Sequence, residues 1–195
     1  MANVEPLARA DIPEFEPIFT GVERFMGFVP NSMFTMARRP EVLRGFQALG
    51  GAVLGTGTVS PALKQLVALM ASTSAGCRYC QAHTSGNAVR AGTPEAKLEA
   101  VYAFETDPQF SEAERAALRL ARDAGLVPNA TTPGHFVALR PYFDDAQIVE
   151  IVAVISFFGF LNRWNDTMAT TLEDEPVAFA SQHLAPAGWE PGKHA

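Results

Sequence analysis

The stretch that decides the fold reads SPALKQLVALMASTSAGCRYCQAHTSGNAVRAG over residues 60–92. Ser60 followed by Pro61 is typical of a helix start, because the serine side chain caps the first turn and proline suits the first helical position. A second helix is expected over residues 77–91, and Gly92 closes it as a C-terminal glycine. The stretch therefore predicts two successive helices, with both cysteines of the chain at the start of the second.

Helix-start signals recur through the rest of the chain. Side-chain caps are expected from Asn31, from Ser111 with Glu114, and from Asp144 with Gln147. No window alternates convincingly with the period of two that marks a strand. These patterns predict an all-α protein. Apolar residues fall at helical spacing in seven further segments, at residues 14–26, 31–38, 40–54, 94–104, 112–124, 133–140 and 145–171.

Length and composition suit one compact domain. The chain has 195 residues, of which 48% are apolar and 14 are phenylalanine, so it can bury a sizeable core. We expect residues 1–57 to form an N-terminal helical lobe that packs on a core at residues 58–172. A loop is predicted at residues 55–58. Residues 173–195 are predicted to be a polar tail, interrupted by proline and glycine, that Trp189 packs back onto the body.

The charge balance argues against nucleic acid as a partner, because the net charge is −6 and no run of lysine and arginine occurs. The most apolar stretch, Ile148 to Leu161, is shorter than the roughly 20 residues that a membrane helix needs. The N-terminus lacks the pattern of a signal peptide. We therefore expect a cytoplasmic protein without membrane contact. The apolar final helix and the Phe-rich N-terminal segment predict a homo-oligomer.

The chemistry is expected at Cys77-x-x-Cys80, where two thiols lie one helical turn apart and can close a disulfide or share a metal. Cys77 lies nearest the positive end of the predicted helix, which favours its thiolate. His83 is one turn beyond Cys80 and can exchange a proton with it. Either thiol can meet a substrate: the more N-terminal Cys77, as is usual in this motif, or the deeper Cys80 beside an apolar pocket.

Two other interpretations of the cysteines compete with redox chemistry. Free cysteines often pack in cores as small hydrophobic side chains. A structural zinc needs four ligands, and only Cys77, Cys80 and His83 cluster in the sequence. We therefore expect no metal and no cofactor. The other three histidines stand isolated in the sequence, and we expect His194 in the tail to be solvated.

The motif GCRYCQAHT at residues 76–84, followed by Ala91 and Gly92, resembles the carboxymuconolactone decarboxylase / alkylhydroperoxidase D-like superfamily. Residues 27–32 (GFVPNS) and 159–165 (GFLNRWN) look similar to its peroxidase-related branch, so the resemblance covers most of the chain. It implies an alkylhydroperoxidase D-like helical bundle, here with an N-terminal helical extension, that oligomerises. It also implies an oxidoreductase, an antioxidant peroxidase or thiol–disulfide exchange protein with a redox-active disulfide.

The resemblance further implies roles for individual residues. In the redox members the second cysteine attacks a hydroperoxide and the first resolves it, which assigns these steps to Cys80 and Cys77. A glutamate and a histidine relay protons in those members. Gln65 stands at the glutamate position, twelve residues before Cys77, and Thr84 stands at the histidine position, with His83 one residue earlier. Reduction would come from a partner thiol protein or a dithiol.

Two alternatives to a thiol-dependent enzyme stay open. The decarboxylase branch acts on a lactone acid without the cysteine pair, and Arg78 and Arg163 are candidates for holding its carboxylate. A non-catalytic oligomeric helical protein with inert, buried cysteines is the other alternative.

Overall fold

A computed structural model describes residues 2–55 and 57–195 of the chain. Within these ranges the chain contains helices and no strand, which confirms the predicted all-α class. The predicted loop at residues 55–58 includes residue 56, which lies outside the described residues. The α-helices of the described residues are α1 (Glu16–Met26), α2 (Asn31–Met36), α3 (Pro40–Gly50), α4 (Pro61–Ala75), α5 (Arg78–Arg90), α6 (Glu95–Glu99), α7 (Glu112–Ala124), α8 (Pro133–Leu139), α9 (Asp145–Met168) and α10 (Asp174–His183).

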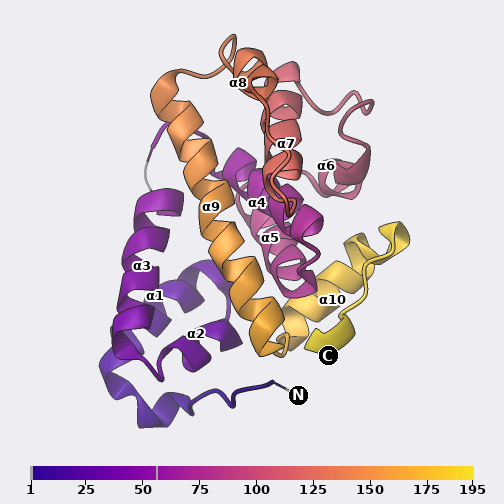
Figure 1. Cartoon of the computed structure of the whole chain (residues 1–195). Helices are drawn as coiled ribbons and strands as arrows, with labels where there is room; N and C mark the ends of the chain where they lie inside the picture. The colour runs from indigo at the N-terminus through magenta and orange to yellow at the C-terminus, as the bar shows by residue number, and fades with distance from the viewer. Residues whose placement is uncertain (1, 56) are drawn as a thin grey trace.

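Helix α4 is the centre of the core. It packs against α5, α7 and α9, and its residues from Leu63 to Ser72 are buried. Figure 1 shows α9 running diagonally across the molecule, with α1 to α3 on one side of it and α4 and α5 on the other. The division into an N-terminal lobe, a core and a tail stays a prediction.

Local capping signals fix several helix starts as predicted. The Ser60 hydroxyl oxygen accepts the Leu63 N–H at 3.2 Å at the start of α4. Capping boxes form at the starts of α7 and α9, from Ser111 with Glu114 and from Asp144 with Gln147. Each cap satisfies a backbone N–H that the first helical turn leaves without a partner.

The prediction that Asn31 caps α2 is wrong. Asn31 is the first residue of α2, and its side chain makes no cap. Its amide nitrogen Nδ2 donates to the Thr171 carbonyl at 3.0 Å, and its backbone N–H donates to Glu173 Oε1 at 2.5 Å. The asparagine therefore ties α2 to the C-terminal segment, a contact that local sequence pattern does not report.

The predicted helix at residues 40–54 divides in two. Helix α3 ends at Gly50, and residues Gly51–Gly55 form a single π-helical turn. A Cβ at Gly50 would lie 3.1 Å from Cζ of Phe157, so the glycine allows the aromatic ring of α9 to approach closely. π-helical turns recur at functional sites, and this one lines a cavity of about 640 Å³.

Helix α9 is longer than the apolar stretch recognised in the sequence. Its 24 residues are long and apolar enough, by length and composition alone, to cross a membrane, so the expectation that the segment is too short is wrong. The central helix of a soluble protein meets the same criteria. Side chains such as Ile151 and Val154 are buried, and α9 packs on α4, α5 and α7.

The C-terminal segment is more ordered than the sequence suggests. Helix α10 packs on α5, and its Pro176 lies in the first turn, where proline does not interrupt a helix. Trp189 is buried, and its indole N–H donates to the Arg78 carbonyl at 3.2 Å, which confirms that it anchors the tail. His194 is 0% exposed, so the expectation that it is solvated is wrong.

Candidate functional site

The two cysteines lie at the junction of α4 and α5, as predicted. Gly76 ends α4 with a φ of 77°, a left-handed conformation that glycine adopts without strain. Cys77 is the N-cap of α5, and its sulfur accepts the Cys80 N–H at 3.4 Å. Both cysteines are buried and carry free thiols. The turn therefore holds two reduced sulfurs next to the positive end of a helix.

Cys80 lines a cavity of about 640 Å³, and Cys77 is not among the lining residues. The walls are mostly apolar and come from several helices and the π-helical turn. Only Cys80 of the two thiols is thus placed to touch a molecule in the cavity. The apolar wall includes Val22, Met33, Phe46, Leu54, Phe157, Phe158 and Leu161, and the polar lining includes Lys64, Gln65, His83, Thr84 and Asn165.

The environment of Cys80 favours the neutral thiol. Burial raises its pKa well above the ordinary value, and the neighbouring Cys77 thiol raises it further. The Asn165 amide, which donates to the Cys80 sulfur at 3.5 Å, acts in the opposite direction. Any reaction at Cys80 therefore needs its proton removed as the sulfur reacts.

His83 lies at the wall of the same cavity and pairs with a carboxylate. Its Nδ1 is 2.9 Å from the Tyr79 carbonyl, and its Nε2 is 2.8 Å from Glu173 Oε2. The Nε2 contact is an ion pair and is not aligned as a hydrogen bond. Both ring nitrogens of His83 therefore face acceptor oxygens, one on the backbone and one on a carboxylate.

Glu173 is the residue that sequence reasoning missed. It precedes α10, and its other oxygen accepts the Tyr79 hydroxyl at 2.8 Å and the Asn31 N–H. Burial pushes the pKa of Glu173 upward, but the His83 imidazole and the Asn31 N–H outweigh it, so the pKa lies below its ordinary value. The acid beside the histidine thus comes from the C-terminal segment. The sequence shows that residue 173 is acidic, but it does not show that Glu173 pairs with His83.

Gln65 and Thr84 reach the cavity but differ in what they offer. Among the described residues, Oε1 of Gln65 finds no hydrogen-bond donor although the side chain is buried. The Thr84 hydroxyl already donates to the Cys80 carbonyl at 2.7 Å. Gln65 therefore has an acceptor for a bound molecule, whereas the Thr84 hydroxyl is already bonded to the backbone of the helix that carries Cys80.

The charges around this cavity do not favour the lactone-acid alternative, which needs positive side chains to hold a carboxylate. Neither Arg78 nor Arg163 is among its lining residues. Arg163 lines a second cavity, of about 880 Å³, together with Asp166 of α9. Lys64 does line the first cavity, but its ammonium lies 3.3 Å from Glu150 and donates to the Val53 carbonyl.

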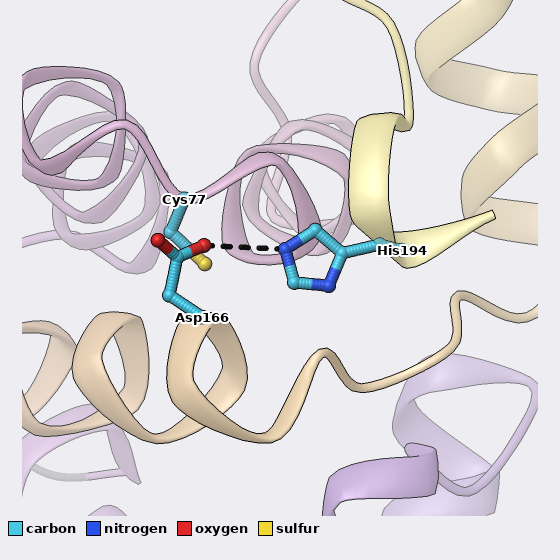
Figure 2. Close-up of side chains that lie close together, drawn as sticks. All are labelled: Cys77, Asp166 and His194. Atoms are coloured by element: carbon cyan, nitrogen blue, oxygen red, sulfur yellow. Dashed lines mark hydrogen bonds and ion pairs between the residues drawn. The ribbon is translucent and has the colours of Figure 1, made fainter. Parts of the chain in front are cut away.

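Cys77 has its own set of neighbours on the opposite side of the turn. One donor atom from each of Cys77, Asp166 and His194 lies within 4.8 Å of the other two. Figure 2 shows the three side chains converging from the cysteine turn, from α9 and from the C-terminal segment. The zinc alternative had grouped Cys77 with Cys80 and His83, but His83 pairs with Glu173 instead.

Comparison with known proteins gives the family. Residues 40–123 match the model of the carboxymuconolactone decarboxylase family. A cysteine-to-alanine variant of the debrominase Bmp8, solved in complex with 2,3,4-tribromopyrrole, is 36% identical, with 92% of this chain and 96% of that chain covered at a TM-score of 0.88. The chain belongs to the carboxymuconolactone decarboxylase / alkylhydroperoxidase D-like superfamily. The resemblance read from the cysteine motif is therefore confirmed.

Two further proteins to which the chain is similar are more distant in sequence. A peroxidase-related protein from Ralstonia eutropha JMP134 with an alkylhydroperoxidase core is 23% identical over 90% of this chain and 94% of its own, with a TM-score of 0.80, which supports the fold alone. The uncharacterized protein YnjA of Escherichia coli is 30% identical over 56% of this chain and 60% of its own length. The family match and the likeness to the debrominase support an enzymatic role.

Proposed function

We propose that this protein is a thiol-dependent reductase that transfers two electrons from Cys80 and Cys77 to a small, mainly apolar molecule in the 640 Å³ cavity. The observation that carries the proposal is the position of Cys80 in an apolar wall, with a second reduced thiol one helical turn away at the helix cap. In this arrangement the deeper cysteine meets the substrate and the more N-terminal one resolves it. Because the cysteine pair needs a thiol reductant, we place the reaction in a reducing compartment such as the cytoplasm.

The electron balance is the same for two substrate classes. A carbon–bromine bond and two thiols give a carbon–hydrogen bond, a disulfide, a bromide ion and a proton. A hydroperoxide and two thiols give an alcohol, water and a disulfide. In both, the Cys80 sulfur first takes the bromine or the terminal peroxide oxygen from the substrate. Cys77 then forms the disulfide by displacing bromide or water from the Cys80 sulfur. A thiol protein or a dithiol then restores both thiols.

Proton transfer is assigned to the His83–Glu173 pair. Cys80 loses a proton as its sulfur reacts, and the reduced substrate gains one. Glu173 holds the imidazole by an ion pair, and Nδ1 is fixed on the Tyr79 carbonyl, so Nε2 is the atom that exchanges the proton. The pair supplies the histidine and the acid that the superfamily motif places at residues 84 and 65.

Halogenated aromatic rings are the first substrate class that we propose for this cavity. The debrominase relative supports this choice, because it is 36% identical over nearly the whole of both chains. The cavity supports it too, since aromatic walls such as Phe157 and Phe158 suit a flat apolar ring. Oε1 of Gln65 is free to accept a ring N–H. Organic hydroperoxides are the second class, because other members of the superfamily are peroxidase-related.

The experiment is a single turnover without added reductant. Fully reduced protein is mixed with one equivalent of 2,3,4-tribromopyrrole or of an organic hydroperoxide, and free thiols, bromide and protein mass are followed. We expect wild type to lose both thiols and to become lighter by two hydrogens. Cys80→Ser is expected to consume neither substrate, and Cys77→Ser is expected to stop with Cys80 modified.

The same experiment contains the result that would overturn the proposal. If a Cys77→Ser/Cys80→Ser double variant consumes the substrates as fast as wild type, the thiols carry no electrons. Activity on a lactone acid that survives loss of both cysteines would support the decarboxylase alternative instead. Slow alkylation of both native thiols, without any turnover, would favour the non-catalytic alternative.

A further inference from the structure

We propose that Cys77, Asp166 and His194 form a binding site for a divalent zinc-like cation, one that excludes the disulfide between Cys77 and Cys80. The three side chains converge beside the cysteine turn (Figure 2), and none of them lines the substrate cavity. Its three residues come from segments that are far apart in the sequence. Its effect on turnover rests on the proposed function, whereas its affinity for the ion does not.

The spacing of the donor atoms suits one metal ion. Oδ1 of Asp166 lies 3.3 Å from Nε2 of His194, and all three donor atoms lie within 4.8 Å of one another. Ligand atoms on a tetrahedral zinc, with bonds of about 2.0 to 2.3 Å, are separated by roughly 3.3 to 3.6 Å. A movement on the order of 1 Å by the sulfur would therefore complete the coordination.

The orientation of His194 indicates that a cation fits between these groups. Its Nδ1 lies 2.8 Å from the Thr170 carbonyl, so this nitrogen carries the hydrogen. When Nε2 carries no hydrogen, it presents a lone pair toward Oδ1 of Asp166, and a bound cation takes the place of the proton that otherwise joins the two atoms. A hydrogen bond from one ring nitrogen to a backbone carbonyl is the usual way in which proteins orient a metal-binding histidine.

The donor set and its surroundings select the type of ion. One sulfur, one imidazole nitrogen and one carboxylate oxygen suit zinc better than magnesium or calcium, which prefer oxygen ligands alone. Lys193 binds the second oxygen of Asp166 at 3.1 Å and leaves Oδ1 for the ion. Cys77 and His194 are buried, but Asp166 is 35% exposed and lines the 880 Å³ cavity, which provides an entry path and room for a water ligand.

Metal binding and disulfide formation compete for one sulfur. Zinc binds Cys77 as a thiolate and releases its proton to solvent. A thiolate held in this way is not available to displace a leaving group from Cys80. Conversely, oxidation of the pair to a disulfide removes one of the three ligands. The site therefore links the redox state of the protein to its metal content.

The test measures zinc affinity directly, by competition with a coloured chelator, on fully reduced protein. We expect wild type and Cys80→Ser to bind one equivalent. His194→Ala, Asp166→Asn and Cys77→Ser are each expected to lose about tenfold to 100-fold or more in affinity. Wild type oxidised by diamide, which takes two electrons and two protons from the pair, is expected to lose the ion. His135→Ala is the control, because His135 also pairs with an aspartate, Asp123, but without a cysteine.

Cobalt in place of zinc gives a second readout that does not depend on activity. A thiolate-to-cobalt charge-transfer band is expected in Cys80→Ser and absent in Cys77→Ser. If reduced wild type binds no zinc, if His194→Ala binds as tightly as wild type, or if the disulfide form keeps the ion, the metal site is wrong. Should His194→Ala fold poorly by circular dichroism, His194→Gln replaces it. Failure of the single-turnover experiment would leave all of these binding results unchanged.

Discussion

Glu173 determines the charge of the His83 site, because it is the acidic group that faces the imidazole. Its side chain is 13% exposed and also accepts two hydrogen bonds, from Tyr79 and from Asn31. A buried carboxylate of this kind stabilises the fold only while its own proton is absent and its donors stay in place. The acid–base function proposed for the site and the stability of the C-terminal segment therefore rest on one side chain.

Replacement of this residue by its amide should change both stability and its dependence on pH. Because the folded pKa of Glu173 lies below the ordinary value of 4.5, its contribution is fully present above 4.5 and is lost as pH falls from 4.5 through the lower folded pKa. We expect Glu173→Gln to lower the free energy of unfolding at pH 7 by about 1 to 3 kcal/mol. Urea unfolding at pH 7 and at about pH 4 should give a smaller difference between wild type and variant at the lower pH.

A surface glutamate two residues away provides the control. Glu175 is 53% exposed and pairs with Arg90, so Glu175→Gln should change the free energy of unfolding by less than about 1 kcal/mol. An equal loss of stability in the two variants, or a constant loss across the pH range, would contradict the assigned role of Glu173.

At the residue scale the sequence predicts the members of the site better than their partners. Cys80, His83 and Gln65 were all expected near the chemistry, because they share two neighbouring helices, and all three line the cavity. Glu173 and His194 come from the C-terminal segment, about 90 or more residues further along the chain than the cysteines. Pairing over that distance depends on tertiary packing, which single-sequence patterns do not contain.

At the element scale, local signals succeed where the partner of each group lies within one turn. Ser60, Ser111 and Asp144 cap their helices as predicted, since each bonds a backbone N–H three residues away. Asn31 does not, because α2 begins at Asn31 itself and the asparagine side chain bonds the distant Thr171 carbonyl instead. The prolines and glycines of residues 173–195 predict an interrupted tail, whereas Pro176 lies in the first turn of α10, where proline is compatible with a helix.

The contact between α4 and α7 provides a prediction at this scale. Gly125 follows α7, and an added Cβ would lie 2.7 Å from the Ala71 carbonyl oxygen and 3.0 Å from Cβ of Ser74. Backbone cannot yield as a flexible side chain does, so Gly125→Ala should separate the helices and cost about 1 to 3 kcal/mol. Thermal unfolding should show a decrease of roughly 2 to 4 °C for each kcal/mol.

Gly45 in α3 is the matched control for this substitution. A Cβ there meets nothing within 4 Å, and alanine is the better helix former, so Gly45→Ala should stabilise by about 0.5 to 1 kcal/mol. If both variants shift the melting temperature in the same direction, the close approach of α4 to α7 does not limit stability.

At the scale of the whole molecule, α9 combines two roles. One face carries core residues such as Ile151 and Val154. The other leaves Val149 at 66%, Val152 at 38% and Phe160 at 41% exposure, and these positions share one side of the helix. These exposed apolar side chains add to the apolar composition of α9. Composition and length together make the helix resemble a membrane span. We propose that a second copy of the chain covers this apolar stripe, since exposed apolar patches commonly mark interfaces.

The prediction is that the protein is an oligomer that separates when the stripe is charged. Light scattering at micromolar concentration should give wild type a mass above the 21.0 kDa of one chain. Val149→Glu places a carboxylate at the most exposed position of the stripe, where burial against a second copy would leave the charge without a partner, so its mass should fall toward that of the monomer. Val137→Glu is the control, because Val137 is 70% exposed but belongs to α8 and not to the stripe on α9. A monomeric wild type would refute the oligomer, and equal effects of the two variants would refute the assignment of its interface to α9.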